Sequence, residues 1–205
     1  MRLKIGVMGA ATGDLRPEHR RAAYTLGHTI AAAGCITITG ACPGLPLEAA
    51  MGAKAAGGLV IGISPALSLD EHIHKYHSPA DSHDLLIFTG SGLMGREVVN
   101  IRSSDMVAIV GGRSGTLGEL AIAYDEGKLI GVLMGTEGIT DIASIILRAC
   151  AKDTGARVIY ERNPERLVHE LLRLYRSAHF RKPSCFCEER CACEPRAEAE
   201  RAPAG

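Results

Sequence analysis

Seven short runs of apolar residues recur along the chain and alternate with longer segments whose apolar residues fall near helical spacing. Most runs are apolar at nearly every position, which is typical of strands that are covered on both faces of a sheet. The predicted strands cover residues 3–8, 35–39, 59–63, 85–88, 106–110, 129–133 and 158–160. The segments between and after them predict helices over residues 17–33, 45–56, 95–104, 115–127, 139–151 and 164–177, with a short helix or structured excursion at residues 70–77.

The regular alternation of strands and helices predicts an α/β fold with a doubly wound, mainly parallel sheet in a single domain. Right-handed crossovers make successive strands of such a sheet parallel. We expect this domain to span residues 1–178. From about residue 182 the composition shifts to Cys, Glu, Arg, Pro and Ala. We therefore expect residues 179–205 to form a Cys-rich, poorly ordered tail.

Four of the predicted strands run into loops that contain glycine, which predicts a ligand site at one edge of the sheet. Ligands of doubly wound sheets bind outside the carboxyl ends of the strands, where the winding direction reverses. The loop after residues 106–110 reads Gly-Gly-Arg-Ser-Gly-Thr and leads into a helix, whose positive end favours phosphate. The residues expected to bind the ligand or its phosphate are Gly9, Thr12, Gly13, Gly40, Gly44, Gly90, Gly92, Gly111, Gly112, Arg113, Ser114, Gly115 and Thr116.

Two well-known nucleotide motifs are missing from these loops. The first loop reads Gly-Ala-Ala-Thr-Gly rather than G-x-G-x-x-G, and no acidic residue ends the second predicted strand. A conventional NAD site is therefore disfavoured. The chain also has no G-x-x-x-x-G-K-[ST] motif, which disfavours ATP hydrolysis of the P-loop kind.

Two charged residues close to these loops are candidates for chemistry. Arg96 lies at the start of the helix after the fourth strand, where a guanidinium can hold a phosphate or a ribose hydroxyl through forked hydrogen bonds. The alternative is an ordinary surface arginine with a solvated head. Glu119 follows Thr116 by three residues, so the pair fits a capping box at the start of a helix. Alternatively, Glu119 faces the pocket as a general acid or base.

Two clusters contain residue types that bind metals. The first has four histidines among aspartates, in a spacing that matches no standard motif, and we favour an exposed polar excursion over a metal site. Its histidines are His72, His74, His77 and His83. The second lies in the tail, where closely spaced thiols are either zinc or copper ligands or an oxidation-prone terminus. Its cysteines are Cys185, Cys187, Cys191 and Cys193. We expect no metal within the fold itself.

The overall composition narrows the classes of partner. Lys+Arg and Asp+Glu balance at 23 each, so no strong electrostatic attraction to nucleic acid or to an anionic membrane is expected. No apolar run approaches the length of a membrane span, and we find no signal peptide. Cys35, Cys42 and Cys150 are scattered and are interpreted as buried or loop thiols. We therefore expect a cytoplasmic, reducing location.

Several motifs occur in an order that resembles one known family. They are Ile5-Gly-Val-Met-Gly9, Thr39-Gly40 through Gly44, Glu48 and Gly52-Ala53, Ala56-Gly57-Gly58, Gly62-Ile63-Ser64-Pro65, and the segment from Arg96 through Asp105 to Glu119. With them the chain resembles the lonely-guy (LOG) family and its neighbours, which include molybdenum-cofactor carrier proteins and Rossmann-like nucleotide-binding proteins. The resemblance covers about residues 3–160. It implies a Rossmann-like fold and a homodimer or higher homo-oligomer.

The hydrolases of this family cleave the N-glycosidic bond of N6-modified adenosine 5′-monophosphates. They use an arginine nine residues before an aspartate, followed by a P-G-G-x-G-T-x-x-E motif. By that resemblance Asp105 takes the place of the aspartate, and Arg96 and Glu119 take the catalytic places. The same matching puts Gly112, Gly115 and Thr116 in the phosphate loop.

The chain departs from the hydrolase pattern at several of these positions. The proline of the motif is Gly111, its second glycine is Arg113 and its aromatic position is Ser114. The lysine that follows the catalytic arginine in the hydrolases is Glu97 here, and the second glycine loop also differs. These changes weaken the assignment as a hydrolase more than the assignment of the fold. No lysine motif for a pyridoxal phosphate Schiff base is evident, so decarboxylation is rejected.

Two functions therefore remain open. The first is a phosphoribohydrolase that cleaves a purine nucleoside 5′-monophosphate. The second is a non-catalytic carrier or sensor of a nucleotide or a molybdopterin-type ligand. Neither requires a cofactor, and the partner in both is a small nucleotide monophosphate or pterin-type molecule. A third, weaker hypothesis is a metal-handling protein that works through its tail.

Overall fold

The computed structural model describes residues 1–178, and every predicted strand and helix is present in it, with ends that differ by at most three residues. The strands are β1 (Lys4–Gly9), β2 (Ile36–Thr39), β3 (Val60–Ser64), β4 (Leu85–Phe88), β5 (Met106–Val110), β6 (Leu129–Leu133) and β7 (Arg157–Glu161). The helices are α1 (Pro17–Ala32), α2 (Leu45–Ala55), α3 (Leu69–His74), α4 (Gly92–Arg102), α5 (Ser114–Asp125), α6 (Ile139–Cys150) and α7 (Pro164–Ser177). The predicted tail, with its four cysteines, lies outside the described residues.

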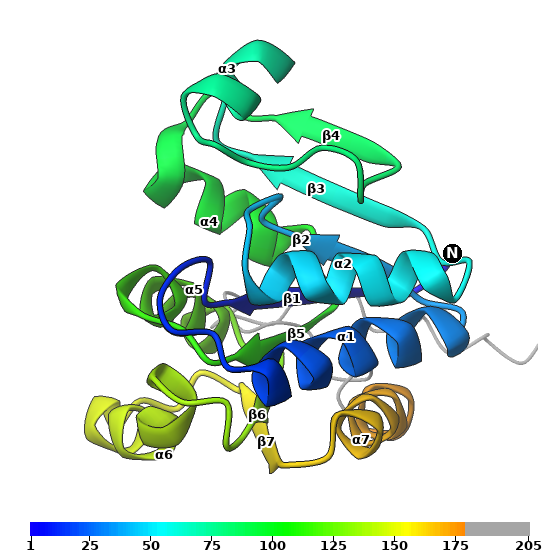
Figure 1. Cartoon of the computed structure of the whole chain (residues 1–205). Helices are drawn as coiled ribbons and strands as arrows, with labels where there is room; N and C mark the ends of the chain where they lie inside the picture. The colour runs from blue at the N-terminus through cyan, green and yellow to red at the C-terminus, as the bar shows by residue number, and fades with distance from the viewer. Residues whose placement is uncertain (179–205) are drawn as a thin grey trace, which may run out of the picture.

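The strands form one sheet in the order β4-β3-β2-β1-β5-β6-β7, and every neighbouring pair is parallel. The arrowheads of the strands accordingly point to the same side of the molecule (Figure 1). From β1 the chain builds outward to β4, returns through α4 to β5 beside β1, and then builds outward in the other direction. The winding reverses between β1 and β5, so a ligand is expected outside the ends of these two strands. The predicted doubly wound α/β fold is confirmed.

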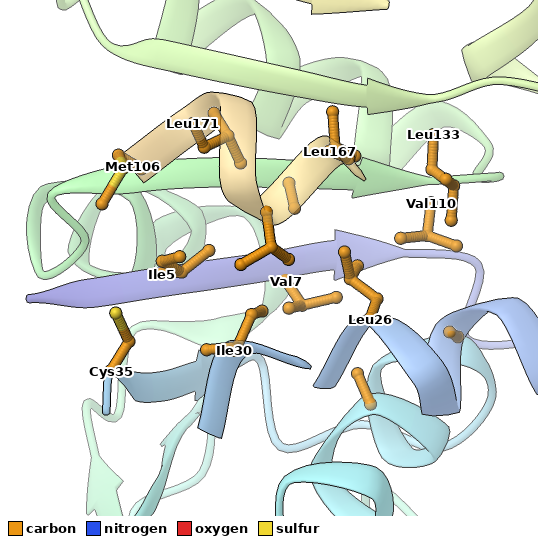
Figure 2. Packing of buried hydrophobic residues seen from close by; sticks show 14 of the residues in the cluster. Ile5, Val7, Leu26, Ile30, Cys35, Met106, Val110, Leu133, Leu167 and Leu171 are labelled. Atoms are coloured by element: carbon orange, nitrogen blue, oxygen red, sulfur yellow. The ribbon is translucent and has the colours of Figure 1, made fainter. Parts of the chain in front are cut away.

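Helices cover both faces of the sheet. Helices α1, α2 and α7 pack together on one face, whereas α4, α5 and α6 pack on the other. On the first face, Ile5 and Val7 of β1 lie against Leu26 of α1, and Leu167 of α7 closes the same core (Figure 2). A second core joins α4, α5 and α6 to the opposite face of β1, β5 and β6. None of the helices within residues 1–178 combines the length and the apolar character needed to cross a membrane.

Candidate functional site

A cavity of about 420 Å³ opens at the carboxyl ends of β1, β2 and β5, at the point where the winding reverses. It is walled by the loops after these three strands and by the first turns of α4 and α5. The lining residues are Gly9, Ala10, Ala11, Thr12, Gly40, Cys42, Pro46, Leu93, Met94, Arg96, Glu97, Arg113, Ser114, Gly115, Thr116 and Glu119. A pocket with apolar walls and a few convergent polar groups at this place in the fold is typical of a ligand site.

The loop after β5 turns sharply into α5 and forms one wall of the cavity. Gly111 and Gly112 have φ angles of +61° and +111°, a backbone conformation that side chains with a Cβ rarely adopt. Helix α5 begins at Ser114, and its first residues line the cavity. The N–H groups of a first helical turn have no acceptor within the helix, and they lie at its positive end. This wall is therefore suited to an anionic group such as phosphate.

Arg96 of α4 supplies a buried positive charge to the wall of the cavity. Its exposed fraction is 7%, and its Nε and Nη1 atoms are buried without a hydrogen-bond partner. The guanidinium lies over the backbone of Gly40, where Nη1 occupies the space that a Cβ would need. Buried donors are nearly always satisfied in a folded protein, so two unused ones on the wall of a cavity are suited to an anionic group. The interpretation of Arg96 as a solvated surface arginine is wrong.

Glu119 is buried beside this arginine, with 6% of its surface exposed. One carboxylate oxygen, Oε1, lies 3.8 Å from Arg96 Nη1 and accepts a hydrogen bond of 3.3 Å from Asn100 Nδ2. Burial raises the pKa of Glu119 to about 7, an effect that Arg96 and Asn100 oppose and the nearby charge of Glu97 strengthens. The side chain can therefore exchange a proton near neutral pH.

The capping-box interpretation of Glu119 is wrong. Helix α5 begins at Ser114 with Arg113 as its N-cap residue, so Thr116 lies within the first turn instead of capping it. Glu119 is then one turn further along the helix, where its side chain lines the cavity. The general acid or base alternative agrees with this position, although its chemical role stays a prediction.

Glu97 is a second buried carboxylate on the cavity wall, with 4% of its surface exposed. Its side chain packs against the glycine face of α5, where Oε2 lies 2.5 Å from the place a Cβ of Gly118 would take. Burial raises the pKa of Glu97, and the charge of Arg96 partly opposes this. Neighbouring residues of α4 therefore present one cation and one carboxylate to the same cavity.

Sequence reasoning did not single out Cys42 or Asn100 as parts of the site. Cys42 lines the cavity, and burial raises the pKa of its thiol to about 11, so the thiol is neutral at physiological pH. Asn100 is fully buried and donates to both Glu119 Oε1 and the sulfur of Met8. The sequence does hold a signal for Asn100, because it follows Arg96 by four residues and so lies on the same face of α4.

Most of the predicted ligand-binding residues lie at the cavity or next to it. Those that line it are Gly9, Thr12, Gly40, Arg113, Ser114, Gly115 and Thr116. A smaller hollow of about 230 Å³ shares Thr12 and Arg113 with it and adds Gly13 and Gly112. Gly44 instead packs against the backbone of Ala10 and Ala11, and the N–H of Gly111 donates to Thr136 Oγ1.

Gly90 and Gly92 line neither cavity. They follow β4, which is the outermost strand, and the wall of the cavity begins directly after them, at Leu93 of α4. The sequence suggested four converging loops because it does not reveal the order of the strands. The loops after β1, β2 and β5 do converge, and α4 carries Arg96 back toward them from the edge.

The histidine cluster is an exposed polar excursion only in part, because His74 and His77 are exposed whereas His72 is buried and His83 is half-buried. His72 is fully buried and its Nδ1 lies 2.8 Å from Ser64 Oγ, whereas His83 Nε2 lies 2.9 Å from Thr39 Oγ1. Burial lowers the pKa of His83 to about 4. Across residues 1–178 no three His, Cys, Asp or Glu side chains are grouped so that they could hold a metal ion.

Comparison with known proteins identifies related chains. The sequence matches the SLOG cluster4 family over residues 2–168. It is 39% identical to an uncharacterized protein of Archaeoglobus fulgidus over 131 residues, which are 64% of this chain and 80% of the relative. The fold is similar to the molybdenum cofactor binding protein of Rippkaea orientalis (33% identity, TM-score 0.69, 84% of this chain and 96% of that one). It is also similar to the molybdenum cofactor carrier protein of Chlamydomonas reinhardtii (31% identity, TM-score 0.67, 84% and 99%).

Proposed function

Because the chain belongs to the SLOG cluster4 family, as its resemblance to LOG and molybdenum-cofactor carrier proteins predicted, we propose that it binds and carries a phosphorylated small molecule. The ligand is a nucleoside monophosphate or a pterin-type molecule, and it occupies the cavity between the ends of β1 and β5. The observation that carries this proposal is the buried guanidinium of Arg96, whose Nε and Nη1 have no hydrogen-bond partner. The likeness to two proteins named for the molybdenum cofactor supports a carrier role.

In the proposed complex the phosphate lies between the first turn of α5 and the guanidinium of Arg96. Main-chain N–H groups of Gly115 and Thr116 donate to it from one side, and Nε and Nη1 of Arg96 donate from the other. The ring system of the ligand extends toward the start of α4, where Leu93 and Met94 line the cavity with 57% and 67% of their surfaces exposed. Flexible apolar side chains of this kind pack well against a flat heterocycle.

We also propose that the chain forms a homodimer through its β4 edge. Helix α4 and the edge strand β4 expose a group of large apolar side chains that no part of residues 1–178 covers, namely Leu85, Ile87, Phe88, Leu93, Met94 and Val99. An exposed apolar edge strand is a liability that proteins normally cover. We expect Ile87→Lys to convert a dimer into a monomer in size-exclusion chromatography with light scattering, whereas Ile145→Lys on α6 leaves the dimer intact. A wild-type monomer would contradict this proposal.

Hydrolysis of a nucleoside monophosphate is the second candidate, and Glu119 favours it. A carboxyl group with a pKa of about 7 beside Arg96 can transfer a proton during cleavage of an N-glycosidic bond. In that reaction water adds to C1′ of the ribose, the bond from C1′ to the base breaks, and the released base takes up a proton. Glu97 counts against this candidate because it puts a negative charge where the hydrolases that the sequence resembles have a lysine.

A binding assay with product analysis tests the proposal and separates its two forms. The purified full chain is titrated with AMP, GMP and 6-hydroxymethylpterin phosphate by calorimetry, and each mixture is then analysed for free base by chromatography. We expect at least one of these molecules to bind at one per chain, to be displaced by inorganic phosphate, and to be recovered intact. Release of free base that Glu119→Ala abolishes would favour the hydrolase. If none of the three binds, the proposed function is wrong.

A further inference from the structure

The carboxylate of Glu97 has no hydrogen bond and no ion pair in the described part of the chain, although it is almost completely buried on the cavity wall. Its neighbour Arg96 is paired with Glu119, and no oxygen of Glu97 lies within 4.0 Å of the guanidinium nitrogens. A buried carboxylate is costly unless hydrogen-bond donors satisfy it. Glu97 therefore presents unpaired acceptors on the wall of the cavity, where a ligand can supply the donors.

Helix α5 determines the position of this carboxylate. Glu97 packs where α5 has glycine at 115 and 118, and a Cβ on Gly118 would come within 2.5 Å of Glu97 Oε2. Any larger residue at position 118 would force the carboxylate to move. Glu97 thus lies between α4 and α5 and borders the ligand cavity.

An ionised carboxylate only accepts hydrogen bonds, and its two oxygens match a pair of parallel N–H donors. A phosphate group offers no such donors, so Glu97 must face another part of the ligand. Neighbouring N–H donors in one plane are found on heterocycles that carry an amino group beside a protonated ring nitrogen. This arrangement is the 2-amino-4-oxopyrimidine edge, which guanine and pterins share.

We propose that Glu97 is a specificity-determining residue that accepts two hydrogen bonds from the 2-amino-4-oxopyrimidine edge of the ligand and thereby rejects adenine. This inference rests on the proposed function, because it takes the phosphate to lie against Arg96 and α5. Adenine presents one amino donor beside a ring nitrogen that is itself an acceptor. The second carboxylate oxygen would then face a lone pair, and a buried acceptor without a donor is heavily penalised. Hypoxanthine keeps the ring N–H but lacks the amino group.

The first test is a series of matched ligands. We expect the wild-type chain to bind GMP at least about tenfold more tightly than AMP, with IMP between them, as a bidentate pair of hydrogen bonds typically discriminates. The same titration with 6-hydroxymethylpterin phosphate distinguishes the two sources of this edge. Tighter binding of the pterin indicates a pterin ligand, whereas tighter binding of GMP indicates a guanine nucleotide. Either result agrees with the proposed role of Glu97.

The second test uses substitutions at Glu97 and at Gly118, the glycine against which Glu97 packs. Glu97→Gln presents one acceptor and one donor, which is the complement of adenine, so the preference for GMP over AMP should disappear or reverse. Gly118→Ala should weaken that preference without any change of charge, because the new methyl group displaces the carboxylate. Alanine is a good helix former, so α5 should persist in this variant. Glu165→Gln, at an exposed position on α7, is the matched control and should keep the wild-type ratio.

The outcomes distinguish the role of Glu97 from the proposed function, which is the binding of a phosphorylated ligand. Equal affinities for GMP and AMP in the wild type, or an unchanged ratio in Glu97→Gln, would overturn the role of Glu97 while ligand binding itself stands. Failure of GMP, AMP, IMP and the pterin phosphate to bind at all would overturn both. A ratio that collapses in Glu97→Gln and in Gly118→Ala, but not in Glu165→Gln, supports the inference.

Discussion

Replacing Arg96 with methionine is expected to weaken the binding of a phosphorylated ligand by about 100-fold or more, the size of effect seen when a buried charged partner is removed from a complex. Arg96 Nε and Nη1 are buried and make no hydrogen bond in the free protein, so they can donate to a phosphate without first breaking other hydrogen bonds. Methionine keeps most of the length and the apolar stem of the side chain but offers no donor. The affinities of wild type and variant for GMP, AMP and 6-hydroxymethylpterin phosphate are compared by calorimetry.

The free variant should stay folded at about pH 6, with a modest loss of unfolding temperature. Removing one partner of a buried ion pair leaves the other charge without compensation, but Glu119 can lower that cost by staying protonated, since burial raises its pKa to about 7 even beside Arg96. Arg102→Met, on the same helix but with an exposed side chain paired to Glu126, is the control and should bind normally. Unchanged affinity in Arg96→Met, or loss of affinity together with unfolding, would contradict a ligand-binding role for this residue.

The fold could be predicted because its signals are local. The runs at residues 106–110 and 129–133 are wholly apolar, and such runs form strands that helices cover on both faces. Pro17 and Gly34 marked the ends of the first helix for equally local reasons, since proline suits a first turn and Gly34 has a positive φ just after the helix ends. The glycines after β5 in the same way predicted a sharp turn into α5.

The parts of the site that could not be predicted depend on contacts between distant segments. Gly90 resembled the other loop glycines in sequence, but the order of the strands moves it away from the cavity. The burial of Glu97 requires α4 to pack on α5, and no local pattern of residues encodes that contact. The choice between the two alternatives for Glu119 depended on where one helix begins. Helix α5 begins two residues before Thr116, and that shift turns a presumed cap into a wall of the cavity.

The cavity contains more buried negative than positive side chains, so the binding of an anionic ligand is coupled to the protonation of Glu119. Arg96 is the buried cation there, and Glu97 and Glu119 are the two buried carboxylates. Glu119 alone has its pKa raised to about 7, because burial and the charge of Glu97 together outweigh the attraction of Arg96. A phosphate that enters such a cavity adds further negative charge, which favours the protonated form of Glu119. Ligand binding is therefore expected to be accompanied by proton uptake near neutral pH.

The variant Glu119→Gln is expected to be more stable than the wild type at about pH 8, by about 3 kcal/mol, and to match it at about pH 4. The folded protein holds the proton of Glu119 up to a pH of about 7, whereas the unfolded chain releases it near the ordinary value of 4.5. The unfolded state thus binds fewer protons between these two values, and the free energy of unfolding falls as pH rises through this window. Glutamine resembles the protonated acid and never ionises, so the variant escapes this loss.

Urea unfolding of both proteins at several pH values checks this prediction. His83, whose folded pKa is about 4, also titrates in this range, but it does so in wild type and variant alike and cancels in their difference. The stability difference should therefore grow from near zero to its full value between about pH 4.5 and 7 and stay constant above that range. Glu165→Gln, which removes an exposed carboxyl group, should show no such growth. A difference that is the same at every pH would mean that Glu119 titrates normally, and its position beside Arg96 would then have no consequence for proton transfer.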